Sequence, residues 1–130
     1  MTAGEARERV VGARVARIAT VTPDGAPHVV PICFAVDGDT LYSAVDTKPK
    51  ATTELKRLRN IRANPRVSVL VDEYSEDWTQ VWWARADGTA QVLDPDEHAL
   101  GLLAAKYPQF EPAGAMIVVS VARWSGWAAS

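Results

Sequence analysis

The sequence has a single cysteine, Cys33, among its 130 residues, so no disulfide can form within the chain and a disulfide-stapled scaffold is excluded. No apolar run approaches the roughly 18 residues that a membrane-spanning helix needs. The start of the chain carries Glu5, Arg7, Glu8 and Arg9 where an export signal would be apolar. We therefore expect a cytoplasmic protein with no membrane partner.

Signatures of self-contained catalysis are also missing. The sequence contains no G-x-S-x-G nucleophile elbow, no H-E-x-x-H, no P-loop, no G-x-G-x-x-G and no cysteine pair. His28 and His98 are the only histidines, and a zinc site would need both of them brought together with carboxylates. We predict no metal site, and if the chain is an enzyme its chemistry belongs to a cofactor.

The net charge of −2 argues against a nucleic-acid-binding surface. This average hides a cationic segment, because residues 48–66 carry a net charge of +6 and the remainder carries −8. Such a pole favours an anionic ligand, and a solvated helix face is the alternative. The length fits one domain, residues 1–130.

Periodicity and turn residues predict a mainly β chain. Helices are expected over 2–12, as a flap or strap, over the segment with Leu55, Leu58 and Ile61, and from Asp94 to Pro108. Six strands are expected, at 14–22, 28–36, 40–45, 66–74, 79–93 and 115–124. The first three should form a meander, and the fifth should bend near Asp87-Gly88. This pattern predicts a six-stranded antiparallel barrel with short flanking helices.

The turn after residue 42 gathers groups that bind anions. It offers the Ser43 and Thr47 hydroxyls, the ammonium groups of Lys48 and Lys50, and the start of a helix. A phosphate could bind there. The alternative is that both lysines are solvated loop charges.

Several short motifs, in order, resemble those of a known family. They are T-x-x-x-D-G-x-P-x-x-x-P at 20–31, a strand ending in a hydroxyl, K-x-K at 48–50, a helix, and N-P-R-V-S at 64–68. This order is similar to that of the pyridoxamine 5′-phosphate oxidase-like, FMN-binding split β-barrel superfamily over about residues 10–125. It resembles in particular the branch that uses the deazaflavin coenzyme F420, and it implies a split β-barrel.

The resemblance also implies a cofactor site. Lys48 and Lys50 would hold the phosphate with Ser43, and Arg57 would assist or meet a carboxylate of the cofactor tail. The strand beside the tricyclic ring would be Val29, Val30, Pro31 and Ile32. Gln80 would approach the ring from a partner subunit. In the oxidases two arginines flank this glutamine, and a further arginine begins the ring-side strand. Both flanking arginines are missing here, and His28 stands in place of the third. These departures argue against a pyridoxamine phosphate substrate.

The activity implied by the resemblance is hydride transfer from reduced F420 to a small unsaturated or heteroaromatic acceptor. It would take place in a homodimer with cofactor sites at the interface. The alternatives are an FMN-binding oxidase or reductase, a non-catalytic F420 or flavin carrier, and a haem-binding split barrel. No catalytic residue is assigned, because the proton-donor candidates Tyr42, Tyr74 and His28 each also suit a core or surface position.

Five tryptophans stand out in an otherwise ordinary composition. Trp82 and Trp83 are adjacent on one expected strand, so they should point to opposite faces and only one can enter the core. The other should lie at a subunit interface or over the cofactor ring, and Trp83 is included among the candidate cofactor contacts. Cys33 is expected to be a buried apolar residue.

Overall fold

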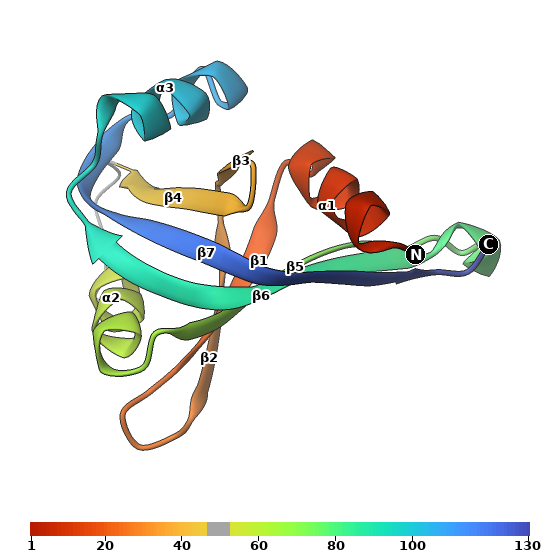
Figure 1. Ribbon diagram of the computed structural model, residues 1–130, viewed down its shortest axis with the longest axis horizontal. Helices are drawn as coiled ribbons and strands as arrows, with labels where there is room; N and C mark the ends of the chain where they lie inside the picture. The colour runs from red at the N-terminus through yellow and green to blue at the C-terminus, as the bar shows by residue number, and fades with distance from the viewer. Residues whose placement is uncertain (47–52) are drawn as a thin grey trace.

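The computed structural model describes residues 1–46 and 53–130 and shows one strongly curved antiparallel sheet with three helices (Figure 1). The sheet has seven strands in the order β2-β1-β5-β6-β7-β4-β3. The helices are α1 (Ala3–Gly12), α2 (Thr53–Ala63) and α3 (Glu97–Lys106). The strands are β1 (Ala16–Val21), β2 (Pro27–Ile32), β3 (Ala35–Asp37), β4 (Thr40–Asp46), β5 (Arg66–Glu73), β6 (Trp82–Leu93) and β7 (Pro112–Ala128). The predicted fold class is confirmed.

One predicted strand is two strands in the structure. The segment 28–36 breaks at Cys33 and Phe34; β2 pairs only with β1, while β3 pairs with β4 at the opposite edge of the sheet. The expected three-stranded meander is therefore wrong. At the break Phe34 turns fully into the core, whereas Cys33 is exposed, contrary to its expected burial. The hydroxyl of Ser43 donates a hydrogen bond of 2.8 Å to the Cys33 carbonyl and fastens the break to β4.

The main core fills the concave side of the sheet. In β1 the burial alternates, so Ala16 and Ile18 face inward, as expected for a strand with one buried face. Helix α1 closes this side of the sheet. Its Ala6 and Val10 are fully buried against β6 and β7, so α1 is part of the core and not a flap.

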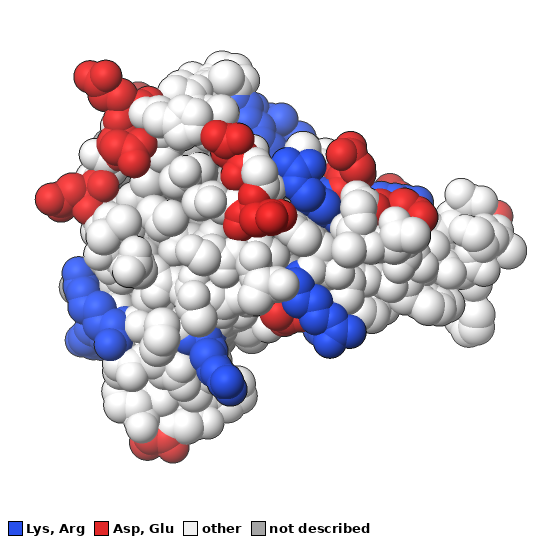
Figure 2. Space-filling model, in the orientation of Figure 1, with Lys and Arg blue, Asp and Glu red and all other residues white. Residues whose placement is uncertain are grey.

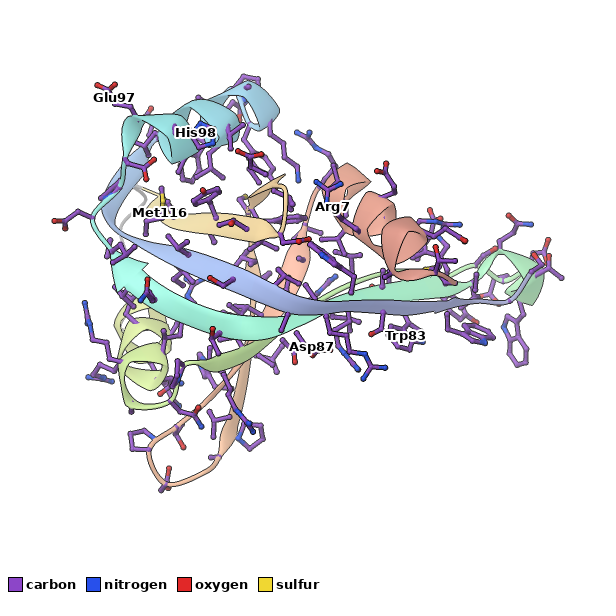
Figure 3. All side chains as sticks on the ribbon, in the orientation of Figure 1. Arg7, Trp83, Asp87, Glu97, His98 and Met116 are labelled. Carbon is purple, nitrogen blue, oxygen red and sulfur yellow. The ribbon has the colours of Figure 1, made fainter. Side chains whose placement is uncertain are left out.

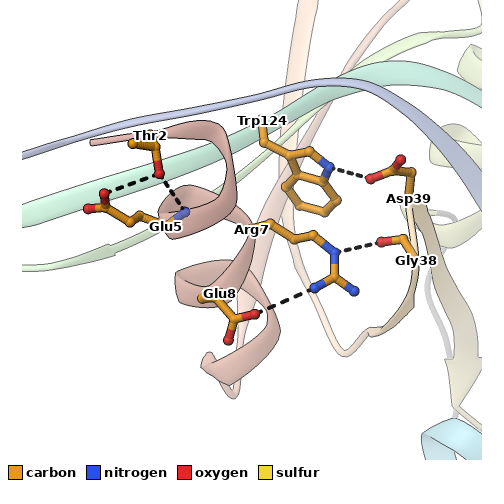
Figure 4. A network of polar contacts seen from close by, with 7 residues as sticks. All are labelled: Thr2, Glu5, Arg7, Glu8, Gly38, Asp39 and Trp124. Atoms are coloured by element: carbon orange, nitrogen blue, oxygen red, sulfur yellow. Dashed lines mark hydrogen bonds and ion pairs between the residues drawn. The ribbon is translucent and has the colours of Figure 1, made fainter.

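Two polar contacts tie the turn between β3 and β4 to the rest of the fold (Figure 4). The Arg7 guanidinium of α1 donates to the Gly38 carbonyl at 2.7 Å, and the Trp124 indole of β7 donates to the Asp39 carboxylate at 2.8 Å. Thr2 caps α1 by accepting from the Glu5 amide, at the start of the expected helix. The edge strand β3 is thereby held to both α1 and β7.

Helix α3 starts two residues later than expected. Asp96, not Asp94, is the N-cap, and its carboxylate accepts from the Ala99 amide at 2.8 Å. Leu103 is fully buried, and Leu100 and Tyr107 pack around it. After the helix, the Tyr107 hydroxyl contacts the Phe34 amide and the carbonyls of Arg14 and Phe34 at 3.0–3.1 Å. One hydroxyl therefore joins three separate segments.

We expect Tyr107→Phe to lower the free energy of unfolding by about 1–3 kcal/mol, because the part-buried polar groups of Phe34 lose this partner while the ring stays in place. Urea denaturation measures this change. Tyr42→Phe is the matched control, since no hydrogen bond involving the Tyr42 hydroxyl is found within residues 1–46 and 53–130. Equal stability of both variants would show that the Tyr107 hydroxyl contributes nothing.

Candidate functional site

Strand β2 exposes backbone hydrogen-bonding groups along its outer edge. The Thr22 amide donates to the Ala26 carbonyl at 2.9 Å, which makes this pair a hydrogen-bonded pair of the β1–β2 hairpin. Because such pairs alternate along a ladder, the residues at 28, 30 and 32 direct their backbone groups to β1, and those at 27, 29 and 31 direct theirs outward. Two of the outward positions are Pro27 and Pro31, which have no N–H. Val29 therefore presents the one outward amide, and its side chain is 59% exposed.

Helix α2 lies beside this hairpin and supplies positive charge. Its predicted apolar face is confirmed by burial of Leu58 and Ile61. Figure 2 shows basic side chains gathered over the α2 end of the molecule, while acidic ones gather around α3. On the buried side of α2, Asn60 is 2% exposed and donates to the Thr20 hydroxyl of β1 at 3.0 Å. Arg57 on the same helix is 8% exposed, so a cation is held within the packed layer.

His28 gains interest as a candidate site residue once the chain is folded. It lies on β2, and its Nδ1 is buried without a hydrogen-bond partner among the residues described. Burial, followed by the positive charges of Lys56 and Arg57, lowers the pKa of His28. An imidazole with an unused nitrogen, whose protonation is opposed by burial and by two cations, thus lies near helix α2. In the sequence this position stands out as a departure from the oxidase pattern and as one of three candidate proton donors.

We expect Lys56→Gln to raise the pKa of His28, because one of the two positive charges that oppose its protonation is removed. An NMR titration of the imidazole protons measures the change. Arg62→Gln removes an equal charge from the exposed face of α2 and should leave that pKa within about 0.2 units, because exposed charges at longer range are screened. Equal shifts in both variants would contradict the local interaction.

The predicted cofactor residues other than Arg57, Gln80 and Trp83 fall into three groups. Val29 and Pro31 are exposed on β2, Val30 is half-buried, and Ile32 is in the core. Ser43 is 2% exposed and already donates to Cys33. Lys48 and Lys50 lie outside the described residues. The structure therefore places β2 and Arg57 in one region. Ser43 lies next to Cys33, which directly follows the last residue of β2.

Gln80 and Trp83 lie elsewhere, on the long arm formed by β5, β6 and β7. Gln80 belongs to a short 3-10 turn, η1 (Trp78–Gln80), at the end of this arm and far from α2 (Figure 1). Trp82 packs against the core, whereas Trp83 points to the opposite face, where the Arg85 guanidinium lies 5.3 Å from its ring centroid (Figure 3). The prediction that the two indoles occupy opposite faces is confirmed. Within one chain the arm and β2 do not form a common site.

These residues fit an anionic cofactor with a planar ring. The outward groups of β2 can meet the polar edge of a ring, the cations of α2 can offset a phosphate, and His28 has an unused nitrogen. No group of three or more His, Cys, Asp or Glu side chains suited to a metal is found in the described part of the chain. Among the described helices, none is long and apolar enough to cross a membrane.

Solved structures with the same fold define the class. A conserved hypothetical protein of Mycobacterium tuberculosis matches with a TM-score of 0.77 at 19% identity, over 99% of this chain and 86% of that one. A FAD-binding protein of Mesorhizobium loti gives 0.70 at 29% identity, over 97% and 94%. A protein described as an F420 reductase gives 0.66 at 28% identity, over 91% and 94%. The fold is a split β-barrel. The pyridoxamine 5′-phosphate oxidase family model matches residues 2–128, and the chain belongs to that family.

Proposed function

We propose that this protein is an oxidoreductase that binds coenzyme F420 along the open edge of β2 and reduces a small unsaturated or heteroaromatic acceptor. The observation that carries the proposal is that β2, with its outward backbone groups, lies within reach of the charges of Lys56 and Arg57 on helix α2. Similarity at 28% identity to a protein described as an F420 reductase supports the deazaflavin. Similarity at 29% identity to a FAD-binding protein keeps a flavin as the second candidate.

The chain's own residues bind and orient in this proposal. When bound, the cofactor supplies a hydride. Val29 holds the polar edge of the ring through its outward amide and carbonyl. Arg57 and the exposed cations Lys56, Arg59 and Arg62 offset the charges of the phosphate and of an acidic tail. Their excess over one phosphate favours a cofactor with further carboxylates.

A second copy of the chain completes the site in this proposal. Gln80 and Trp83 are remote from β2 within one chain, so they can reach the ring only from a partner. The outer face of the sheet supports such an association, because it exposes apolar side chains from several strands, among them Val29, Leu70 and Trp127. Sedimentation at micromolar concentration tests for the dimer, and a monomer at all concentrations would contradict it.

Cofactor titration is the direct test of the function. We expect tryptophan quenching by F420 with a dissociation constant in the micromolar range or below, and much weaker quenching by FMN. Reduced F420 should then be oxidised on addition of a suitable acceptor. Binding without turnover across a panel of enones, quinones and nitroaromatics would favour the carrier, and preference for FMN would favour the flavin enzyme.

The role of the β2 edge has its own prediction. Val29→Pro removes the one outward amide, and we expect it to weaken cofactor binding about threefold to thirtyfold, the effect of losing one hydrogen bond to a ligand. The fold should persist, because this amide does not join the β1–β2 ladder. Val29→Ala removes side-chain bulk but keeps the amide, and should bind nearly normally. Equal losses in both variants would assign the contact to the side chain.

A further inference from the structure

The end of helix α3 brings together two cations that the proposed cofactor site does not use. Lys106 is the last residue of α3, and Arg14 lies between α1 and β1. The Arg14 guanidinium donates to the Lys106 carbonyl at 2.8 Å. Neither side chain forms an ion pair with a carboxylate in the described part of the chain. Figure 2 shows basic side chains at this place, between α3 and α1.

Aromatic rings hold both cations in place. The Arg14 guanidinium lies 5.0 Å from the centroid of the Tyr107 ring. The Lys106 ammonium lies 3.7 Å from the centroid of the Phe34 ring and 5.3 Å from that of Tyr107. No acceptor for this ammonium is found among the residues that the structure describes, and Arg14 uses one N–H. Both cations therefore keep hydrogen-bond donors for a ligand.

The pKa of Lys106 reflects the same shortage of negative charge. Burial, followed by the positive charge of Arg14, lowers this pKa to about 8, and no carboxylate of the described residues shifts it. Asp37 and Asp39, at the adjoining β3–β4 turn, are already bonded to side chains of α3 and β7. An anion between the two cations would relieve their mutual repulsion. The local charge therefore favours an anionic ligand.

The space beside the cations has partly apolar walls. A cavity of about 330 Å³ is lined by Arg14, Tyr107, Pro108 and Gln109. Tyr107 and Pro108 offer apolar surface, and the Gln109 amide can donate or accept a hydrogen bond. This size suits a small molecule with one ring. An inorganic anion would leave the apolar walls unused, so an organic carboxylate fits the lining better.

We propose that Arg14 and Lys106 form a binding site for a small organic carboxylate, whose apolar body lies against Tyr107 and Pro108. The carboxylate would accept charge-assisted hydrogen bonds from the guanidinium and the ammonium. None of these four residues takes part in the proposed cofactor site or in the proposed association of two copies. The site can therefore be tested whether or not the protein binds F420 or forms a dimer.

The test uses three probes of nearly the same shape: benzoate, which is anionic, benzamide, which is neutral, and benzamidine, which is cationic. Backbone amide and arginine Nε–H signals of the cofactor-free protein are followed by NMR at neutral pH. We expect the signals of Arg14, Tyr107 and Gln109 to shift with benzoate, which should bind about threefold to thirtyfold tighter than benzamide. Benzamidine should bind more weakly than benzamide. Equal binding of all three probes would overturn the proposal, as would unmoved signals at these residues or tighter binding of inorganic phosphate than of benzoate.

Two variants test the two cations separately. Lys106→Met removes the charge but keeps an apolar stem against Phe34, and Arg14→Gln removes the guanidinium. Each should weaken benzoate binding about threefold to tenfold and leave benzamide binding unchanged, which also shows that the cavity is intact. Arg62→Gln removes an equal charge from the exposed face of α2 and should leave the benzoate affinity within about twofold. Equal losses in all three variants would reduce the effect to general attraction and overturn the site.

The pH dependence of binding gives a readout in the unaltered protein. Because Lys106 loses its charge as the pH rises through about 8, the benzoate affinity should fall about threefold to tenfold from neutral pH to well above that value, while the benzamide affinity stays constant. Other titratable or charged groups near Lys106 or on the elements packed with α3 are the Arg14 guanidinium, the Tyr107 phenol, whose pKa burial raises, the Cys33 thiol, and the Asp37–His98 pair. The same fall in Cys33→Ser and its absence in Lys106→Met would support the proposal. A fall that persists in Lys106→Met, or that disappears in Cys33→Ser, would contradict the role of Lys106.

Discussion

Replacing Gly88 with alanine is expected to lower the free energy of unfolding by about 3 kcal/mol or more, at the upper end of the cost of overpacking. A Cβ at this position would lie 2.1 Å from the Ser120 carbonyl oxygen and 3.0 Å from the Val121 Cα. These are backbone atoms of β7, so no side-chain rotation can relieve the clash. The pairing of β6 with β7 shifts register between Asp87 and Gly88, as a β-bulge. Thermal or urea unfolding measures the loss.

Gly101→Ala is the matched control for this experiment. Gly101 lies within α3, and a Cβ there would meet nothing within 4 Å. The substitution should be neutral or stabilise the fold by up to about 1 kcal/mol, because alanine is the better helix former. A Gly88→Ala variant as stable as the wild type would mean that β7 can move away from the bulge without penalty.

Simultaneous Lys48→Ala and Lys50→Ala substitution is expected to weaken F420 binding at least about 100-fold, since each charged hydrogen bond to a phosphate contributes about 1.5–3 kcal/mol. This expectation comes from the K-x-K sequence after β4. The unfolding temperature should change little, which separates lost binding from lost folding. Titration of the variant with F420 measures the effect, and unchanged affinity would contradict the phosphate assignment.

The control removes two other cations from the same pole. Arg59 and Arg62 are exposed on α2, and their double alanine variant alters the overall charge by the same amount. We expect it to weaken binding of F420 with its glutamate tail but to leave a tail-less deazaflavin phosphate nearly unaffected. An equal loss with both ligands in both variants would reduce the effect to general electrostatic attraction.

Local signals predicted those elements whose ends are fixed by neighbouring residues. The Thr2 cap and the Asp24-Gly25 turn follow from short-range chemistry, and so does the end of α2 before Asn64-Pro65. The start of α3 differs from the prediction because Asp94 and Asp96, on either side of Pro95, are both good N-caps. In the structure Asp96 is the N-cap. In each success the deciding interaction lies within a few residues of the chain.

The break between β2 and β3 could not be predicted in this way. Residues 29–36 form one apolar run, and the two residues at which it breaks, Cys33 and Phe34, are neither glycine nor proline. Its cause is tertiary, because Phe34 fills the core and Tyr107, over seventy residues away, satisfies its backbone. The candidate site could be predicted only in part, because some of its features also depend on tertiary contacts. Motifs located β2 and α2, while the unused nitrogen of His28 and the remote position of Gln80 emerge only when the chain is folded.

The prolines of β2 have a consequence for solubility. An edge strand normally offers a neighbouring molecule a row of donors and acceptors on which to extend the sheet, which is a route to fibres. Here Pro27 and Pro31 occupy outward positions, so the edge offers one amide, at Val29, and cannot support a continuous intermolecular ladder. The other edge, β3, is three residues long. The protein can therefore keep a sheet edge open for a ligand without becoming a template for aggregation.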